Sequence, residues 1–119
     1  MGRKQQIQPF KTIDSFDMSV GSFTGKQTHV KQTDVVQIDV EWSGGQVSNG
    51  TIAIEATIDG IVWFELDFGS TISLAGASGN HQIIIKQVSF TDIRPVFTQT
   101  NPSATGTLTA TLFATTVGA

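Results

Sequence analysis

Cysteine is absent from the 119-residue sequence, and charged residues are scarce. Without cysteine the chain cannot form disulfides, thiol nucleophiles or thiolate zinc sites. Charged residues make up 14% of the sequence, roughly half of the share found in ordinary soluble domains. A surface with so little charge is typical of a protein covered by neighbours, or of one that does not depend on self-repulsion for solubility.

The shortage of basic and apolar stretches excludes two kinds of partner. Only seven Lys and Arg are spread along the chain, and the formal net charge is -3, whereas nucleic-acid binding needs a dense basic face. No apolar run approaches the roughly 20 residues of a membrane span. The first ten residues also lack the apolar core of a signal peptide. We therefore expect neither a nucleic-acid partner nor a membrane partner.

The length is that of one domain, which can bury a sizeable core without metals or disulfides. Residues 1–11 are rich in basic residues and Gln, and Pro9 disfavours a helix. We predict an extended N-terminal arm over 1–11 and a single β-sandwich domain over 12–119. The arm is expected to lie against its own domain or a neighbouring subunit. Its candidate contact residues are Arg3, Lys4, Ile7 and Phe10.

Alternating apolar and polar residues indicate strands throughout the remaining chain. The clearest case is 33–42, in which Val36, Ile38, Val40 and Trp42 share one face. Further strands are expected at 12–20, 27–32, 71–74, 82–90, 92–100 and 107–117. The run Ile83 to Ile85 indicates a bulge or burial on both faces, and Pro95 favours an edge, a strand start or a bulge. No segment has a helical period. About eight strands predict an all-β fold, an antiparallel sandwich of jelly-roll type.

The hairpin from Thr51 to Phe68 permits two registers around Asp59-Gly60. A two-residue loop would bury two carboxylates, which is costly unless they are paired. A three-residue loop starting at Ile58 avoids this, with Gly60 in the left-handed conformation. It assigns to the core face Ile52, Ile54, Ala56, Val62, Phe64, Leu66 and Phe68. It assigns to the polar face Ala53, Glu55, Thr57, Trp63, Glu65 and Asp67.

Catalytic and metal-binding patterns are weak in this sequence. His29 and His81 are isolated, and no serine lies in a nucleophile elbow. Glu55 and Glu65 on one face could form the carboxylate pair of a hydrolase, but the interpretation we favour is a solvated strand face that carries two charges. The scattered Asp residues suit turns better than a calcium site. We therefore predict no catalytic residues, no metal and no cofactor.

Trp63 is the side chain most suited to a contact role. It falls on the polar face of the hairpin rather than in the core. It either packs over that face, shielding the aliphatic parts of Glu55 and Glu65, or serves as a contact aromatic for a sugar or a protein chain, since aromatic residues anchor interfaces. We count Trp63 with the arm residues as a candidate protein contact.

Four motifs in order resemble small β-sandwich structural proteins of tailed bacteriophages. The motifs are GGQVSNG (44–50), GTIAIEATIDGIVWFEL (50–66), DIRPVFT (92–98) and GTLTATLFA (106–114). In such proteins a T/S-x-DG-x-x-W hairpin precedes a hydrophobic-Arg-hydrophobic strand and a terminal GTL-x-A strand. Arg94 and Pro95 match this pattern in place. The resemblance covers roughly Val35 to Ala114 and leaves the arm without a counterpart.

The resemblance implies a non-enzymatic virion protein, made in the host cytoplasm, of the head decoration (cement) or tail-adaptor type. Its expected partners are other virion proteins: the major capsid protein, or tail or portal components. We expect a homo-oligomer, with a trimer as the specific prediction by analogy with capsid decorations. The alternative is a carbohydrate- or receptor-binding sandwich at a fibre or spike tip.

Overall fold

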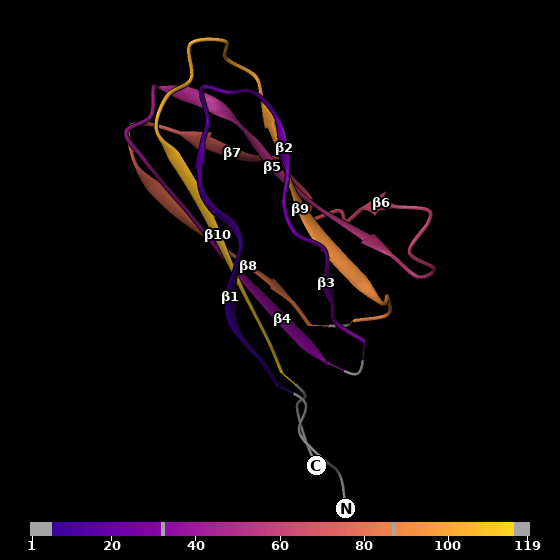
Figure 1. Ribbon diagram of the computed structural model, residues 1–119. Coiled ribbons are helices and arrows are strands. Elements are labelled where there is room, and N and C mark those ends of the chain that lie inside the picture. The colour runs from indigo at the N-terminus through magenta and orange to yellow at the C-terminus, as the bar shows by residue number, and fades with distance from the viewer. Residues whose placement is uncertain (1–5, 32, 87, 116–119) are drawn as a thin grey trace, which may run out of the picture.

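The computed structural model describes residues 6–31, 33–86 and 88–115, with side chains from residue 9 onward. These residues form ten strands and no helix (Figure 1), which confirms the all-β prediction. The strands are β1 (Gln6–Asp17), β2 (Phe23–Thr24), β3 (Thr28–His29), β4 (Val35–Ser43), β5 (Ser48–Thr57), β6 (Phe64–Glu65), β7 (Ile72–Ala75), β8 (Gly79–Ile85), β9 (Asp92–Gln99) and β10 (Thr107–Thr115).

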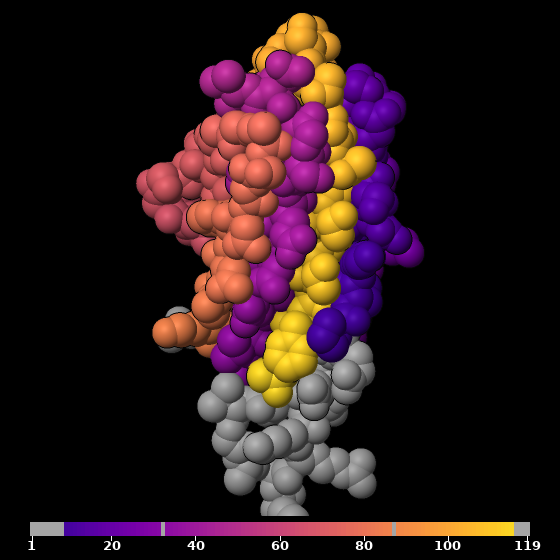
Figure 2. Space-filling view, turned by 90° about the vertical axis from the view of Figure 1, so that its left-hand side faces the viewer, coloured from indigo at the N-terminus to yellow at the C-terminus, as the bar shows by residue number. Residues whose placement is uncertain are grey.

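Two antiparallel sheets pack face to face. Sheet A has the order β1-β10-β4-β8, and sheet B has the order β2-β9-β5-β6. In sheet B, β3 also pairs with β9 and β7 also pairs with β5. Figure 2 shows the strands of sheet A side by side, from β8 in orange to β1 in indigo.

The order of these strands is that of a jelly roll. β2 and β3 share one position beside β9, and β6 and β7 share one position beside β5, which leaves eight strand positions. Counted in chain order, the sheets then read 1-8-3-6 and 2-7-4-5, so each connection between positions passes to the other sheet except the one from β5 to β6. This is the double Greek-key arrangement, and it confirms the sandwich predicted from strand count and turn spacing.

The inner faces of the two sheets form one apolar core. As the alternation predicts, β4 buries every second residue, from Val36 to Trp42. β10 does the same from Leu108 to Ala114, and Ile52, Ile54 and Ala56 on β5 face them from sheet B. Burial of these side chains is the main force that holds the sheets together.

The predicted boundary between arm and domain falls inside a strand. β1 begins at Gln6 and runs along β10, from the pair Gln6 and Thr115 to the pair Asp17 and Thr107. Three register shifts interrupt this ladder. Phe10 lies in β1, is half-buried and packs against the core. Arg3 and Lys4 lie outside the described residues.

Pro95 explains why one edge of sheet B is split into β2 and β3. It lies within β9, pairs with Ile54 of β5 and is buried, so β9 is an inner strand rather than an edge strand. Its carbonyl accepts from the Gly25 N–H at 2.8 Å, but proline has no N–H to return. The ladder on that side is therefore interrupted between Thr24 and Thr28.

The isoleucine run in β8 alternates in the ordinary way. Ile83 and Ile85 are buried, whereas Ile84 is 51% exposed. The β8 ladder with β4 is uninterrupted from Gly79 to Ile85. The expectation of a bulge or of burial on both faces is therefore wrong, because β8 lies at a sheet edge and its outer face meets solvent.

Within the described part of the chain, no helix is long and apolar enough to span a membrane.

Candidate protein-contact site

The segment between β5 and β6 projects from the sandwich as a loop (Figure 1), and several of its apolar side chains are exposed. We call residues 58–63 the tip loop. Ile61 is 80% exposed, Ile58 66% and Val62 65%, and Phe64 at the start of β6 is 44% exposed. The prediction that Val62, Phe64 and Phe68 belong to the core is therefore wrong. Of the predicted core face beyond the turn, only Leu66 packs against the core.

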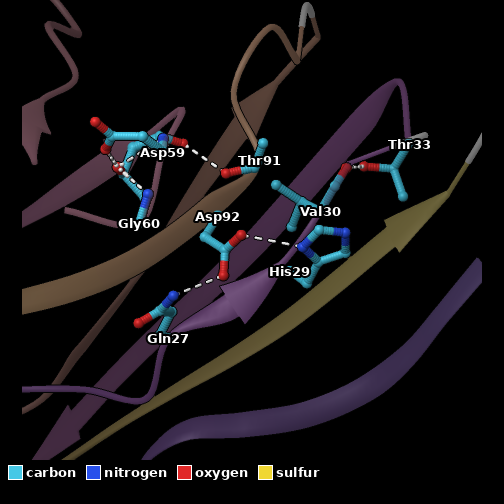
Figure 3. Close-up of polar contacts among 9 residues, drawn as sticks. Gln27, His29, Val30, Thr33, Asp59, Gly60, Thr91 and Asp92 are labelled. Atoms are coloured by element: carbon cyan, nitrogen blue, oxygen red, sulfur yellow. Dashed lines mark hydrogen bonds and ion pairs between the residues drawn. The ribbon is translucent and has the colours of Figure 1, made fainter. Parts of the chain in front are cut away.

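Asp59 determines the shape of the tip loop. Its carboxylate accepts from the backbone N–H groups of Ile61 (2.8 Å) and Val62 (2.9 Å) and from the Thr57 hydroxyl (3.0 Å). These hydrogen bonds favour the charged form, and they hold the pKa of Asp59 below its usual value, with the Val62 N–H contributing most. Gly60 adopts the left-handed conformation (φ 79°), as the hairpin prediction requires. Figure 3 shows this turn beside the start of β9.

The turn around Asp59 also explains the register. The predicted loop pairs Ala56 with Val62, whereas the structure pairs Ala56 with Phe64 and Glu55 with Glu65. The shift is two residues, so each side chain keeps the face that was predicted for it. Glu55 and Glu65 do share a face. The prediction missed that the chain leaves the sheet after Glu65, because β6 has only two residues.

Trp63 joins the tip loop to the outer face of sheet B. The Arg94 guanidinium lies 3.9 Å from the centre of the Trp63 ring, a cation–π contact. Arg94 also forms an ion pair with Glu55 at 2.8 Å, and both side chains are 29% exposed. Glu55 thus lies between a cation on β9 and the like-charged Glu65 on β6. The simpler interpretation of Trp63, a ring packed over the polar face, matches this geometry.

A second set of polar contacts ties the base of the tip loop to β9 and β3. The Thr91 N–H and hydroxyl both donate to the Thr57 carbonyl, at 2.9 and 3.0 Å. The next residue, Asp92, contacts His29 Nδ1 at 3.0 Å and accepts from Gln27 at 2.7 Å (Figure 3). Partial burial raises the pKa of Asp92, but the hydrogen bonds from Gln27 and His29 outweigh it and lower the pKa overall. The tip loop therefore extends from a well-connected base.

Of the five residues predicted as contacts, the three that the structure describes do not gather at one place. Trp63 lies in the tip loop, whereas Phe10 lies in β1 and packs against the core. Ile7 pairs through its backbone with Ala114, and Arg3 and Lys4 are not described. The residues that sequence reasoning missed are Ile58, Ile61 and Phe64. The signal that could have found them is the pair of Thr57 and Asp59, whose side chains organise a wide turn.

The site offers no arrangement for metal binding. In residues 6–31, 33–86 and 88–115, no three His, Asp or Glu side chains come together as a ligand set. Two carboxylates at the tip loop already have partners: Glu55 is bound by Arg94, and Asp59 accepts from the turn it organises. The arrangement can present apolar side chains on a firm base, which is the chemistry of a protein contact.

The fold and the tip loop thus define a small jelly-roll module with an exposed apolar projection. No protein-family model matches the chain, and no curated protein matches it. Among solved structures it is similar to the SPBc2 prophage-derived protein YomS, with a TM-score of 0.64 and 11% identity over 98% of this chain and 97% of that one.

A second similar structure comes from Bacillus endospore appendages, described as a novel family of disulfide-linked pili. Its TM-score is 0.50 at 10% identity, over 98% of this chain and 93% of that one. At such identities the likeness shows a shared fold. Because this chain contains no cysteine, a disulfide link between subunits is not open to it.

Proposed function

We propose that the protein is a non-enzymatic structural subunit of a bacteriophage virion, of the capsid decoration or cement type, that binds neighbouring virion proteins through its tip loop. The observation that carries the proposal is the exposure of Ile58, Ile61 and Val62 on a loop whose base is held by hydrogen bonds. Exposed apolar side chains gathered on one projection mark an interaction surface. A repeated subunit needs only modest contacts, because many copies bind together.

Two further observations support this function. Charged residues are few, which suits a surface that neighbouring chains cover. The similar fold of a prophage-derived protein and of a pilus subunit is compatible with a phage or assembled-polymer role. Such a subunit would stabilise a shell by binding only to its assembled state.

The test is the protein content of phage particles. Particles purified from a lysate of the strain that carries the gene should contain this protein at a constant copy number relative to the major capsid protein. A tagged chain with Ile61→Ser and Val62→Ser should fold normally but be lost from the particles. The matched control is Val47→Ser, at an equally exposed apolar residue between β4 and β5 (87% exposed). A protein that is abundant in the lysate and absent from every particle fraction would refute the proposal.

A further inference from the structure

The charges of this chain are distributed unevenly between two segments. No Lys or Arg occurs between Lys31 and Lys86, and no Asp or Glu occurs between Asp17 and Asp34. The first stretch contains the tip loop and β6. The second contains β2, β3 and the turns beside them. Each segment also exposes large apolar side chains. Each therefore combines an apolar surface with formal charges of one sign.

We call residues 58–68 the acidic tip. Its exposed apolar side chains are Ile58, Ile61, Val62, Phe64 and Phe68. Its acidic residues are Asp59, Glu65 and Asp67, all exposed. A groove of about 490 Å³ continues this surface between β6 and β7, and Glu65, Asp67 and Phe68 are among the residues that line it. The acidic tip is therefore an apolar projection beside an acidic groove.

We call residues 20–31 the basic edge. Val20 is 75% exposed and Phe23 40% exposed, and the Phe23 ring stacks on Phe16 at 4.5 Å between centroids. Lys26 and Lys31 are exposed on the same segment. Asp92 on the neighbouring strand β9 is already engaged by Gln27 and His29. The basic edge is therefore an apolar surface that carries two exposed lysines.

These two surfaces lie at opposite edges of sheet B. β2 and β3 pair with β9 on one side, β6 pairs with β5 on the other, and β9 and β5 lie between them. At the end near Thr91 the two surfaces come within two strand spacings, roughly 10 Å, because Thr91 accepts from the Lys31 N–H and donates to the Thr57 carbonyl, where the tip begins. Even so, among the described residues no ion pair joins the two lysines of the edge to a carboxylate of the tip. A contact that pairs these charges would therefore join two molecules.

We infer that the occupant of the acidic tip is a second copy of this chain, bound through its basic edge. This rests on the proposed function, and it names the neighbour at the tip. The contact is head-to-tail: apolar side chains of the tip pack on Val20 and Phe23, and Glu65 and Asp67 face Lys26 and Lys31. Such a heterologous contact leaves one tip and one edge free in each pair, so it propagates into a ring or an open chain. The predicted trimer is one closed form.

The test uses two variants that each spoil one surface. The edge variant carries Lys26→Glu and Lys31→Glu and keeps its tip. The tip variant carries Ile61→Ser and Val62→Ser and keeps its edge. All four positions are exposed, and circular dichroism with thermal melting checks that both variants fold. Sedimentation velocity over a wide concentration range then gives the mass of each protein alone and of the equimolar mixture.

Wild type should increase in mass with concentration, and high salt should weaken its association. Each variant alone should stay near the 12.7 kDa monomer, with its dissociation constant raised roughly tenfold or more, as for central interface residues. The mixture should form a complex of twice that mass and nothing larger, because only one intact tip and one intact edge remain.

Three results would overturn the inference. The first is a wild type that stays monomeric at every concentration. The second is an edge variant that associates as strongly as wild type, which would indicate a tip-to-tip contact, and the third is a tip variant that associates as strongly as wild type. If wild type is monomeric in solution but present on particles, this inference fails while the proposed function stands.

Discussion

Glu65, Glu55 and Arg94 form a row on the outer face of sheet B. We predict that the effect of Glu55→Gln on the free energy of unfolding changes sign when Arg94 is replaced. Arg94 binds Glu55 at 2.8 Å, and Glu55 faces Glu65 directly across the strand pair. Both members of the ion pair are 29% exposed. An exposed pair contributes up to about 1 kcal/mol and a charged hydrogen bond about 1.5–3 kcal/mol, so we expect roughly 1 kcal/mol for this half-exposed pair.

Glu55→Gln removes this ion pair, about 1 kcal/mol, but also the repulsion from Glu65, about 0.2–1 kcal/mol. It should therefore destabilise the wild-type protein by roughly 0.5 kcal/mol, or about 2 °C in Tm for a domain of this size. In an Arg94→Met background the same substitution should stabilise the fold. Glu55 then has no cation and only the like-charged Glu65 opposite, a repulsion of about 0.2–1 kcal/mol. The repulsion from Glu65 is common to both backgrounds and cancels, so the coupling between the two positions is that of the ion pair, about 1 kcal/mol.

Urea unfolding of the four proteins of this cycle, followed by tryptophan fluorescence, measures the effect. The coupling should shrink in high salt, because charges at the surface are screened. A Glu55→Gln substitution that costs the same free energy in both backgrounds would refute the reasoning. Arg94→Met should also change the emission of Trp63, whose ring it no longer covers.

Three further predictions concern other positions. Gly79→Ala would place a Cβ 2.3 Å from the buried Trp42 ring and should lower the unfolding free energy by about 1–3 kcal/mol, whereas Ser78→Ala, next to it and exposed, should be neutral in the same urea experiment. The pKa of Asp59 is depressed in the folded state, so its charged form stabilises the turn at pH above the unfolded-state pKa. That stabilisation is lost as the pH falls through the folded-state pKa. Trp63 emission should change in this acidic range, and Asp59→Ala should abolish the change. Titration of a glycan panel should leave Trp63 fluorescence constant, since Arg94 occupies one face of its ring; a saturable change with one sugar would favour the receptor-binding alternative.

Strand alternation was sufficient to predict the core of this protein. Val36, Ile38, Val40 and Trp42 are buried as the period-two pattern predicts. Burial of one face leaves the other face to solvent, so local sequence identifies the inward side chains without knowledge of strand partners. The same argument holds for Leu108 to Ala114.

The candidate site was less predictable, because its properties depend on where the chain leaves the sheet. Val62 and Phe64 are in phase with Ile54, and a pattern alone assigns them to the core. β6 has two residues, so the strand is too short to carry these side chains under the opposite sheet. Pro95 is the reverse case, because the sequence favours an edge position for it and the structure places it in an inner strand. The strand beside it is divided into β2 and β3 around the position where proline lacks an N–H donor.

By itself the sequence determined the all-β class, the inward faces of β4 and β10, and the scarcity of charge. It also determined which residues of the hairpin share a face of the sheet. These properties arise from local periodicity and composition, which do not require knowledge of distant partners. Only the tertiary structure decided that Ile61 and Val62 project into solvent, that Arg94 joins Trp63 to Glu55, and that the acidic and basic segments lie at opposite edges of one sheet. Those features depend on which strands pair, and pairing between residues far apart in the chain is decided by the packing of the whole sandwich.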